Sequence, residues 1–288
     1  MEIGIGLPNA IAGTDGPTLL EFARRADRAG FSSLGTVDRL VYPNHEPLVA
    51  LGAVAAATER IRVATTLLNA PYRLNTALLA KQLATVDVLS GGRLWVAIGL
   101  GGREDDYQAS GASLKTRGRT LDQQLGDLKS IWAGEPYAGT GPIGPEPVQG
   151  GGPPLIIGGG ADASFERMAR FAEGWIMGAS VPDQFAEGAA KADAAWQRAG
   201  REGRPVKKSL TYYSLGPNAE EKAHEGLGHY YAWLGEGIMN MIVGNTATTP
   251  EEVKSRAEGF AEAGCDEVIF FPGSSDPAQV DLLAEAVL

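Results

Sequence analysis

The feature that most constrains the fold is a regular alternation of short apolar runs with longer amphipathic segments. Eight runs are rich in β-branched and aromatic residues, and they lie at residues 3–7, 33–37, 61–68, 94–98, 155–157, 175–177, 209–215 and 267–271. Most are apolar at successive positions, which is typical of parallel strands buried on both faces. Eight such units without a break predict a (β/α)₈ barrel, with an open doubly wound sheet as the alternative.

Helix-start signals indicate that the segments between the apolar runs are helices. Thr18 with Glu21 predicts a capping box, and so does Thr249 with Glu252. Pro250 falls just inside the second start, where its missing N–H leaves no hydrogen bond unmade. We therefore expect helices to begin near residues 18 and 249.

The length fits one barrel domain over residues 1–288, because such barrels commonly run to roughly 250 residues. Two segments are too long for simple connections. Residues 133–154 are rich in glycine and proline, and we expect an excursion at the barrel mouth. Residues 219–244 are long and aromatic, and they predict a helix that covers the mouth or meets another subunit.

Charge and cysteine content exclude several classes of function. The net charge is −10, so binding of nucleic acid through a basic face is not expected. Cys265 is the single cysteine, which excludes an intramolecular disulfide and fits a reducing compartment. The start, MEIGIGLPNA, lacks the pattern of a signal peptide, and no apolar run is long enough for a membrane span. We expect a cytoplasmic protein.

The strongest functional motif is IIGGGADASFERMA, in which an apolar strand runs into Gly158, Gly159 and Gly160 before a helix begins near Ala163. Glycines let the backbone approach an anion, and the helix start offers free N–H groups and the positive end of the dipole. The motif predicts a phosphate site. A Rossmann fingerprint is disfavoured because no acidic residue follows the next strand, and a plain tight turn is the other alternative.

Other candidate residues follow the second and fourth strands. Asp38 is positioned to accept a hydrogen bond from a ligand, and Arg39 to hold an anion or an aspartate; an internal salt bridge is the alternative. His45 is a candidate for proton transfer, or a plain surface residue. Residues 99–107, GLGGREDDY, form a second glycine loop or a turn with a solvated charge cluster. Three scattered histidines and one cysteine predict no metal site.

The sequence resembles the luciferase-like flavin-dependent oxidoreductases over nearly its whole length. The resemblance is carried by LATVDVLSGGRLWVAIGLG together with LLNAPYRLNT, TRGRTLDQQL and PPLIIGGGADASFERMARFAEGW. This superfamily includes bacterial luciferase, FMN-dependent monooxygenases and enzymes that use coenzyme F420. The resemblance implies a (β/α)₈ barrel with a flavin or deazaflavin at the carboxyl ends of the strands.

The resemblance also implies which residues hold the cofactor. It places the phosphate after the fifth strand and a non-prolyl cis peptide, expected at Leu67–Leu68, behind the ring. The positions that match are Leu67, Leu68, Asn69, Gly99, Leu100, Gly158, Gly159, Gly160 and Ala163. Many F420 enzymes of the family have Asp-His where this chain has Asp38-Arg39.

The missing histidine affects proton transfer, because a guanidinium stays protonated. His45, Tyr42 or Tyr107 would then move protons, or the hydride chemistry needs none from the protein. Arg39 would instead stabilise a reduced, anionic ring.

The sequence thus predicts a flavin- or F420-dependent oxidoreductase that performs hydride transfer or monooxygenation of a small organic substrate. Two alternatives are a non-catalytic flavin-binding protein and a cofactor-free lyase or isomerase that uses the glycine site for a phosphate. We favour F420 over FMN because basic residues that suit its acidic tail are available, at Arg103, Lys115, Arg117 and Arg119. The family resemblance also implies a homodimer.

Overall fold

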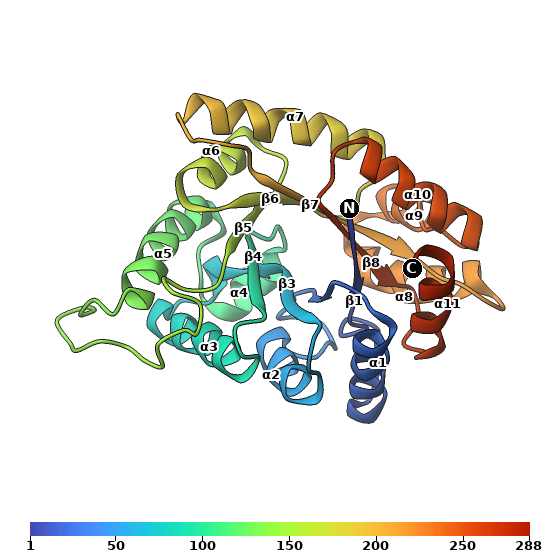
Figure 1. Cartoon of the computed structure of the whole chain (residues 1–288), viewed down its shortest axis with the longest axis horizontal. Coiled ribbons are helices and arrows are strands. Elements are labelled where there is room, and N and C mark those ends of the chain that lie inside the picture. The colour runs from blue at the N-terminus through green and yellow to red at the C-terminus, as the bar shows by residue number, and fades with distance from the viewer.

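The computed structural model describes residues 1–288 and shows a closed barrel of eight parallel strands in sequential order (Figure 1). The predicted barrel is therefore confirmed, and the open sheet is excluded. The strands are β1 (Glu2–Gly6), β2 (Ser33–Thr36), β3 (Arg62–Asn69), β4 (Leu94–Gly99), β5 (Leu155–Gly158), β6 (Gly174–Met177), β7 (Val206–Tyr213) and β8 (Glu267–Pro272). Each overlaps a predicted run, because strands covered on both faces are mostly apolar.

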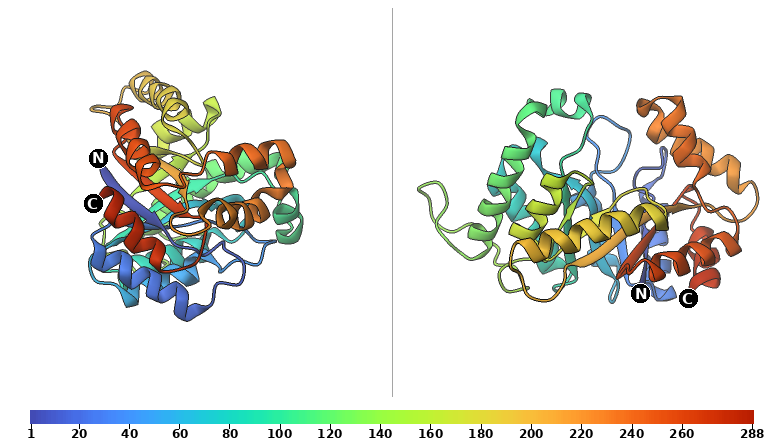
Figure 2. Two further views of the ribbon diagram at one scale, coloured as in Figure 1. Left: turned by 90° about the vertical axis from the view of Figure 1, so that its right-hand side faces the viewer. Right: turned by 90° about the horizontal axis from the view of Figure 1, so that it is seen from above.

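Helices surround the barrel, and α8 and α9 project beyond the carboxyl ends of the strands (Figure 2). None of the helices has both the length and the apolar character needed to cross a membrane. The helices are α1 (Gly16–Ala29), α2 (Pro47–Ala57), α3 (Thr76–Leu89), α4 (Glu104–Ser110), α5 (Arg117–Trp132), α6 (Asp162–Phe171), α7 (Pro182–Arg198), α8 (Ala219–Tyr231), α9 (Glu236–Gly244), α10 (Pro250–Glu262) and α11 (Ala278–Val287).

The hydrophobic core has two parts. The larger one lies between the strands and the surrounding helices, and it includes the stacked rings of Trp175 and Phe185. The smaller one contains Trp95, Tyr212 and Phe271 and fills the barrel interior. Each large side chain removed from water in this way contributes about 1.5–3 kcal/mol. The barrel is a packed scaffold, which leaves the loops free to carry function.

A buried ionic cluster closes the amino-terminal end of the barrel. The Glu267 carboxylate is fully buried and accepts hydrogen bonds from Lys208 and from the Ser33 hydroxyl, the latter at 2.6 Å. Arg62 adds a second cation at 3.3 Å. Burial alone would raise the pKa of Glu267, but Lys208 and Arg62 outweigh it and hold this pKa below its usual value. This cluster lies opposite the mouth, where residues serve stability.

Two sequence expectations about helices and loops need correction. Asp15, not Thr18, caps α1, because its carboxylate accepts the Thr18 amide at 2.8 Å. The capping box of Thr249 and Glu252 is confirmed. Residues 133–154 do not lie at the mouth.

The glycine- and proline-rich excursion lies at the amino-terminal end of the barrel. It links the end of α5 to the start of β5, so it must return to the side where strands begin. The Gln149 side chain donates to the Leu94 carbonyl at the first residue of β4, at 2.7 Å, and fixes the excursion there. It therefore takes no part in the mouth, although it extends far from the barrel in Figure 1.

Candidate active site

The glycine turn after β5 presents unpaired backbone N–H groups at the mouth. Gly159 has φ +126°, which favours glycine, and its carbonyl accepts the Trp175 indole N–H at 2.8 Å. Gly160 and Ala163 are exposed, and no side chain caps the start of α6. The first N–H groups of a helix have no partner within it. The turn therefore forms a backbone site suited to an anion.

Space above Gly160 is open, whereas Gly158 is covered. A Cβ atom at Gly160 would meet nothing within 4 Å. A Cβ at Gly158 would lie 2.4 Å from the side chain of Leu67, which would have to move to admit it. The glycines thus have two roles. Gly158 accommodates Leu67, and Gly160 leaves the anion site open.

Leu67 belongs to a bulge in β3 that turns its side chain toward the mouth. The pairing of β3 with β4 shifts register between Thr65 and Leu68. The non-prolyl cis bond in this bulge joins Thr66 to Leu67, so the expected bond at Leu67–Leu68 is wrong by one residue. Leu68 points the other way and is fully buried in the larger core. The bulge therefore brings Leu67, and not Leu68, to the carboxyl end of the barrel.

The loop after β4 lies against this bulge. Gly99 is buried beneath Leu67, whose Cδ1 would be 3.1 Å from an added Cβ. Gly101 has φ +65° and lies close to the amide of Asn69. Leu100 is half-buried, and its carbonyl accepts the hydroxyl of Tyr107. Leu67 thus covers Gly99, and Asn69 lies beside Gly101 of the same loop.

Asp38 fixes the bulge in place. Its carboxylate accepts the Asn69 amide N–H at 2.9 Å and pairs with Arg73 at 3.1 Å. Burial raises the pKa of Asp38, and Arg73 opposes this shift only in part. Its side chain is 1% exposed. Asp38 is therefore placed to position Asn69, and it has little access to a molecule at the mouth.

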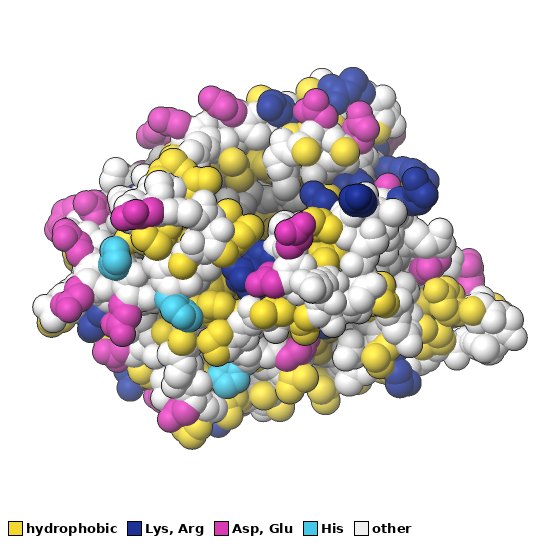
Figure 3. All heavy atoms as spheres, turned by 180° about the vertical axis from the view of Figure 1, so that it is seen from behind, with side chains coloured by type: hydrophobic (Ala, Val, Ile, Leu, Met, Phe, Trp, Pro, Cys, Tyr) yellow, Lys and Arg dark blue, Asp and Glu magenta, His cyan; other side chains and the backbone are white.

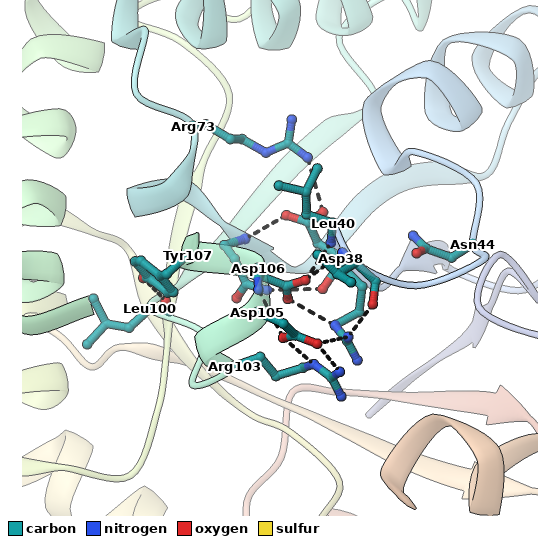
Figure 4. Close-up of polar contacts among 12 residues, drawn as sticks. Asp38, Leu40, Asn44, Arg73, Leu100, Arg103, Asp105, Asp106 and Tyr107 are labelled. Atoms are coloured by element: carbon teal, nitrogen blue, oxygen red, sulfur yellow. Dashed lines mark hydrogen bonds and ion pairs between the residues drawn. The ribbon is translucent and has the colours of Figure 1, made fainter. Parts of the chain in front are cut away.

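Arg39 is held in an internal ion pair. Its Nε donates to Asp106 at 2.9 Å, and its Nη2 donates to the Val41 carbonyl at 2.9 Å. The guanidinium also packs on the rings of Tyr42 and Tyr230, 5.2 and 5.7 Å from their centroids. Of the two readings left open, the structure shows the salt bridge. Figure 4 shows Asp106 beside Asp38, where α4 meets the loop after β2.

Asp106 was not singled out from the sequence, yet it connects two mouth loops. Besides Arg39, it accepts the backbone N–H groups of Leu40 and Val41, at 3.1 and 2.6 Å. The sequence signal was the acidic run before Tyr107, but spacing alone does not show which carboxylate points inward. Asp106 is buried, whereas its neighbour Asp105 pairs with Arg103 and lies 3.9 Å from the Arg39 guanidinium.

His45 lies apart from this network. Its Nε2 is 2.8 Å from the Thr14 carbonyl, and its backbone N–H donates to Asn9 at 3.0 Å. Both contacts join it to the loop after β1. The other two candidates for proton transfer are also engaged. Tyr42 bonds His229 Nδ1 at 2.7 Å, and burial raises the pKa of Tyr107 to about 12.

The segment of α8 and α9 covers part of the mouth, as the first reading of residues 219–244 expected. Tyr231 bonds the hydroxyl of Tyr212 on β7 at 2.5 Å. Trp233 stacks on Arg103 at 4.9 Å, and Ile242 packs on the barrel interior. Figure 3 views the face that carries α8 and α9, and it shows Lys and Arg side chains next to carboxylates in a hollow bordered by apolar groups.

Of the basic residues named from the sequence, two remain open to solvent. Lys115 and Arg119 are exposed, whereas Arg117 is half-buried and donates to the Leu114 carbonyl at 2.7 Å. Arg103 is engaged with Asp105. Lys115 lies in the short turn just before α5 and Arg119 in the first turn of α5, a helix that contacts α6.

The comparison with known families identifies the chain. A family model described as luciferase-like monooxygenase matches residues 1–268. The chain belongs to this family. Proteins similar to the chain include one named as an FMNH(2)-dependent monooxygenase and others named as F420-dependent dehydrogenases.

Individual relatives are distant. An uncharacterized protein of Mycobacterium tuberculosis (strain ATCC 25618 / H37Rv) is 35% identical over 168 residues, which cover 56% of this chain and 59% of that protein. The FMNH(2)-dependent dimethylsulfone monooxygenase of Pseudomonas putida is 25% identical over 228 residues, covering 74% of this chain and 61% of the relative. An F420-dependent secondary alcohol dehydrogenase, solved with an F420–acetone adduct, has a TM-score of 0.81 at 19% identity and covers 99% and 98% of the two chains. This last likeness shows the shared fold.

Proposed function

We propose that the protein is a flavin- or deazaflavin-dependent oxidoreductase whose cofactor is held by its phosphate-bearing tail at the turn of Gly158, Gly159 and Gly160. The observation that carries the proposal is the uncapped start of α6 directly after this turn, with open space above Gly160. Free N–H groups and the helix dipole favour an anion at such a start. Asp162 adds one carboxylate there, but it is exposed and therefore screened by water.

Other residues at the mouth would orient the cofactor ring and set its electrostatic environment. Leu67 offers an apolar surface for a flat ring, supported from below by Gly99 and Gly158. Asp38 and Asn69 hold the bulge rigid through two hydrogen bonds, of 2.9 and 3.0 Å. When bound, the cofactor supplies the hydride or oxygen chemistry, and the protein supplies orientation and electrostatics. Arg39 adds a buried positive charge whose position is fixed by Asp106.

We favour F420 over FMN as the cofactor. Lys115 and Arg119 offer two exposed cations beyond the start of α5, the helix that contacts α6, and an acidic tail leaving the glycine turn would gain from them. FMN ends at its phosphate and would not use them. The Pseudomonas putida relative is named for FMNH(2) and the alcohol dehydrogenase for F420, so both cofactors remain candidates.

Titration of the purified protein with oxidised F420 and with FMN tests this choice. We expect F420 to bind more tightly, and its affinity to fall in Lys115→Gln/Arg119→Gln, because two charge contacts with the tail are lost. FMN binding should change little in the same variant. Tight binding of FMN alone would overturn the preference for F420, and failure of both to bind would overturn the proposed function.

We also propose that the protein is a homodimer joined through α2 and α3. The sequence of α2 is apolar on all sides, which is typical of a helix buried on all sides. In the single chain Val49 is 72% exposed, and Leu78 and Leu89 of α3 are 51% and 53% exposed. These residues line one apolar groove of about 280 Å³, and a second copy would cover it.

Light scattering on Val49→Glu tests the dimer. We expect the wild type to have twice the mass of one chain and the variant to shift toward one chain, because a charge would be buried at the contact. Ile238→Glu on α9 is the matched control, since Ile238 is also exposed at 47% but lies away from α2. A monomeric wild type, or loss of the dimer only in the control, would contradict the assignment.

A further inference from the structure

Tyr42 and His229 form a hydrogen-bonded pair at the mouth. The Tyr42 hydroxyl oxygen lies 2.7 Å from His229 Nδ1, and the centroids of the two rings are 5.4 Å apart. Tyr42 belongs to the loop after β2, whereas His229 belongs to α8, 187 residues further along the chain. Both residues line a cavity of about 450 Å³, which falls within the range of small-molecule sites. The pair therefore joins two elements at the edge of a space that a small molecule can enter.

The hydrogen-bond partner of each candidate decides whether it can pass a proton on. Tyr107 donates its hydroxyl to a backbone carbonyl, and His45 Nε2 lies 2.8 Å from another. A backbone carbonyl accepts a hydrogen bond but is too weak a base to take up the proton. The imidazole of His229, in contrast, can gain a proton at one ring nitrogen and lose one at the other. Of the three residues named from the sequence for proton transfer, Tyr42 alone thus has a partner that can carry the proton further.

His229 connects the pair with water. Its ring is exposed, and Nε2 makes no hydrogen bond within the protein, so this nitrogen is free to exchange a proton with solvent. In the tautomer with hydrogen at Nε2, Nδ1 is the acceptor for the Tyr42 hydroxyl. Lys222 and Glu225 of α8 are the other titratable residues that line the cavity, and the loops after β1 and β8 add none. Tyr42 and His229 are thus the only two lining residues that are bonded to each other through groups able to exchange a proton.

Arg39 and Tyr230 hold the Tyr42 ring in place. The Arg39 guanidinium packs 5.2 Å from the centroid of this ring, and the Tyr230 ring meets it edge-on at 5.2 Å. Burial raises the pKa of Tyr42, and the positive charges of Arg39 and Arg103 oppose this rise only in part. Tyr42 is therefore a neutral phenol at neutral pH, which gives its proton to His229 as it gains another from the cavity.

We propose that Tyr42 and His229 move a proton between the cavity and bulk water during the reaction. This inference rests on the proposed function, because oxidation of a hydroxyl group by hydride transfer also releases the hydroxyl proton, and reduction of a carbonyl group takes one up. In the oxidation, the substrate O–H bond breaks and its proton bonds to Tyr42 Oη, while the Tyr42 proton passes to His229 Nδ1. The imidazolium then loses one proton to water, and the electron pair of the broken C–H bond leaves with the hydride to the redox cofactor. Arg39 stays protonated, so it positions Tyr42 and moves no proton.

Exchange of the Tyr42 hydroxyl proton with solvent, measured by NMR on the full chain, tests the pair. We expect this exchange to slow at least about tenfold in His229→Asn, because the amide oxygen replaces Nδ1 as hydrogen-bond acceptor but cannot take up the proton. His224→Asn, at an exposed histidine of the same helix, is the matched control and should change nothing. Equal exchange rates in wild type and His229→Asn would show that the bond only holds α8 to the loop after β2, and would overturn the proposal.

The tautomer of His229 gives a second readout that does not depend on a bound cofactor. Nitrogen NMR of the imidazole should show hydrogen at Nε2 and an accepting Nδ1 in the wild type. This preference should weaken in Tyr42→Phe, because the hydroxyl donor is lost. A wild-type ring with its hydrogen at Nδ1 would contradict transfer of the Tyr42 proton to that atom.

A cofactor titration on the same variants separates the proton-transfer pair from the proposed function. We expect F420 or FMN to bind His229→Asn with the affinity of the wild type, since neither Tyr42 nor His229 belongs to the glycine turn or to α6. Intact cofactor binding together with exchange that does not depend on His229 would overturn the pair alone. Failure of both cofactors to bind the wild type would overturn the proposed function, whereas exchange that depends on His229 would still support the pair.

Discussion

Replacing Glu267 by glutamine should lower the free energy of unfolding by about 3–5 kcal/mol, as expected when one partner of a buried ion pair is removed. Glu267 is fully buried and is the partner of Lys208, whose side chain is 7% exposed. The variant leaves the Lys208 ammonium without a countercharge above the ring of Trp95, 4.4 Å from its centroid. Chemical denaturation followed by circular dichroism measures the loss.

Two comparisons make this result specific. Glu258→Gln on the exposed side of α10 should change stability by less than about 0.5 kcal/mol. The double variant Glu267→Met/Lys208→Met should be more stable than Glu267→Gln, because no unpaired charge remains in the interior. A single variant that loses less than about 1 kcal/mol would show that the cluster contributes little.

The effect should also depend on pH. The pKa of Glu267 lies below its unfolded value of about 4.3, so its contribution is fully present above that value. As pH falls toward the lower folded-state pKa, the contribution is lost. The difference in stability between wild type and Glu267→Gln should therefore narrow below pH of about 4. A stability difference between wild type and Glu267→Gln that grows as the pH falls would contradict the lowered pKa of Glu267 in the folded state.

Replacing Gly160 by aspartate should weaken cofactor binding at least about tenfold, because it places a negative charge at the proposed phosphate site. The position tolerates a side chain, since a Cβ would meet nothing within 4 Å and the backbone does not require glycine there. The expected loss is therefore electrostatic and not a folding defect. Fluorescence titration with F420 measures it, and thermal unfolding confirms that the fold is kept.

Neutral and distant variants distinguish charge from bulk. Gly160→Asn has nearly the same shape as Gly160→Asp and should bind within about threefold of wild type, because no charge is added. Gly141→Asp, in the exposed excursion, should have no effect. High salt should reduce the difference between the aspartate and asparagine variants. Equal losses of F420 affinity in Gly160→Asp and Gly160→Asn would show that the size of the side chain causes the loss, and would contradict a phosphate at this position.

The architecture could be predicted from the sequence because the signal is repeated eight times. Each strand of a closed parallel barrel is covered on both faces, so the run 94–98 and, apart from Glu267, the run 267–271 are apolar and locate β4 and β8 closely. The excursion over residues 133–154 was harder to place. Its composition shows a long loop, but only the chain direction, from the end of α5 to the start of β5, shows which end of the barrel it occupies.

The candidate site could be predicted only in part. Glycine motifs are local, so Gly158, Gly159 and Gly160 were identified with the helix that follows them. Pairing between side chains is not local. The partner of Arg39 is Asp106, 67 residues away, and Asp38 is held by Arg73. The non-prolyl cis bond was expected at Leu67–Leu68, one residue beyond its actual place. The position of the bulge depends on how β3 pairs with β4, which the sequence of β3 alone does not reveal.

The central claim is that the turn after β5 holds the phosphate of a redox cofactor. A crystal structure of the wild-type protein with bound F420 tests it most directly. The account predicts the phosphate within hydrogen-bond distance of the backbone N–H groups of Gly160 and the first turn of α6, with the ring against Leu67. A phosphate bound instead at Ser274 and Ser275 after β8, with the β5 turn free, would contradict it.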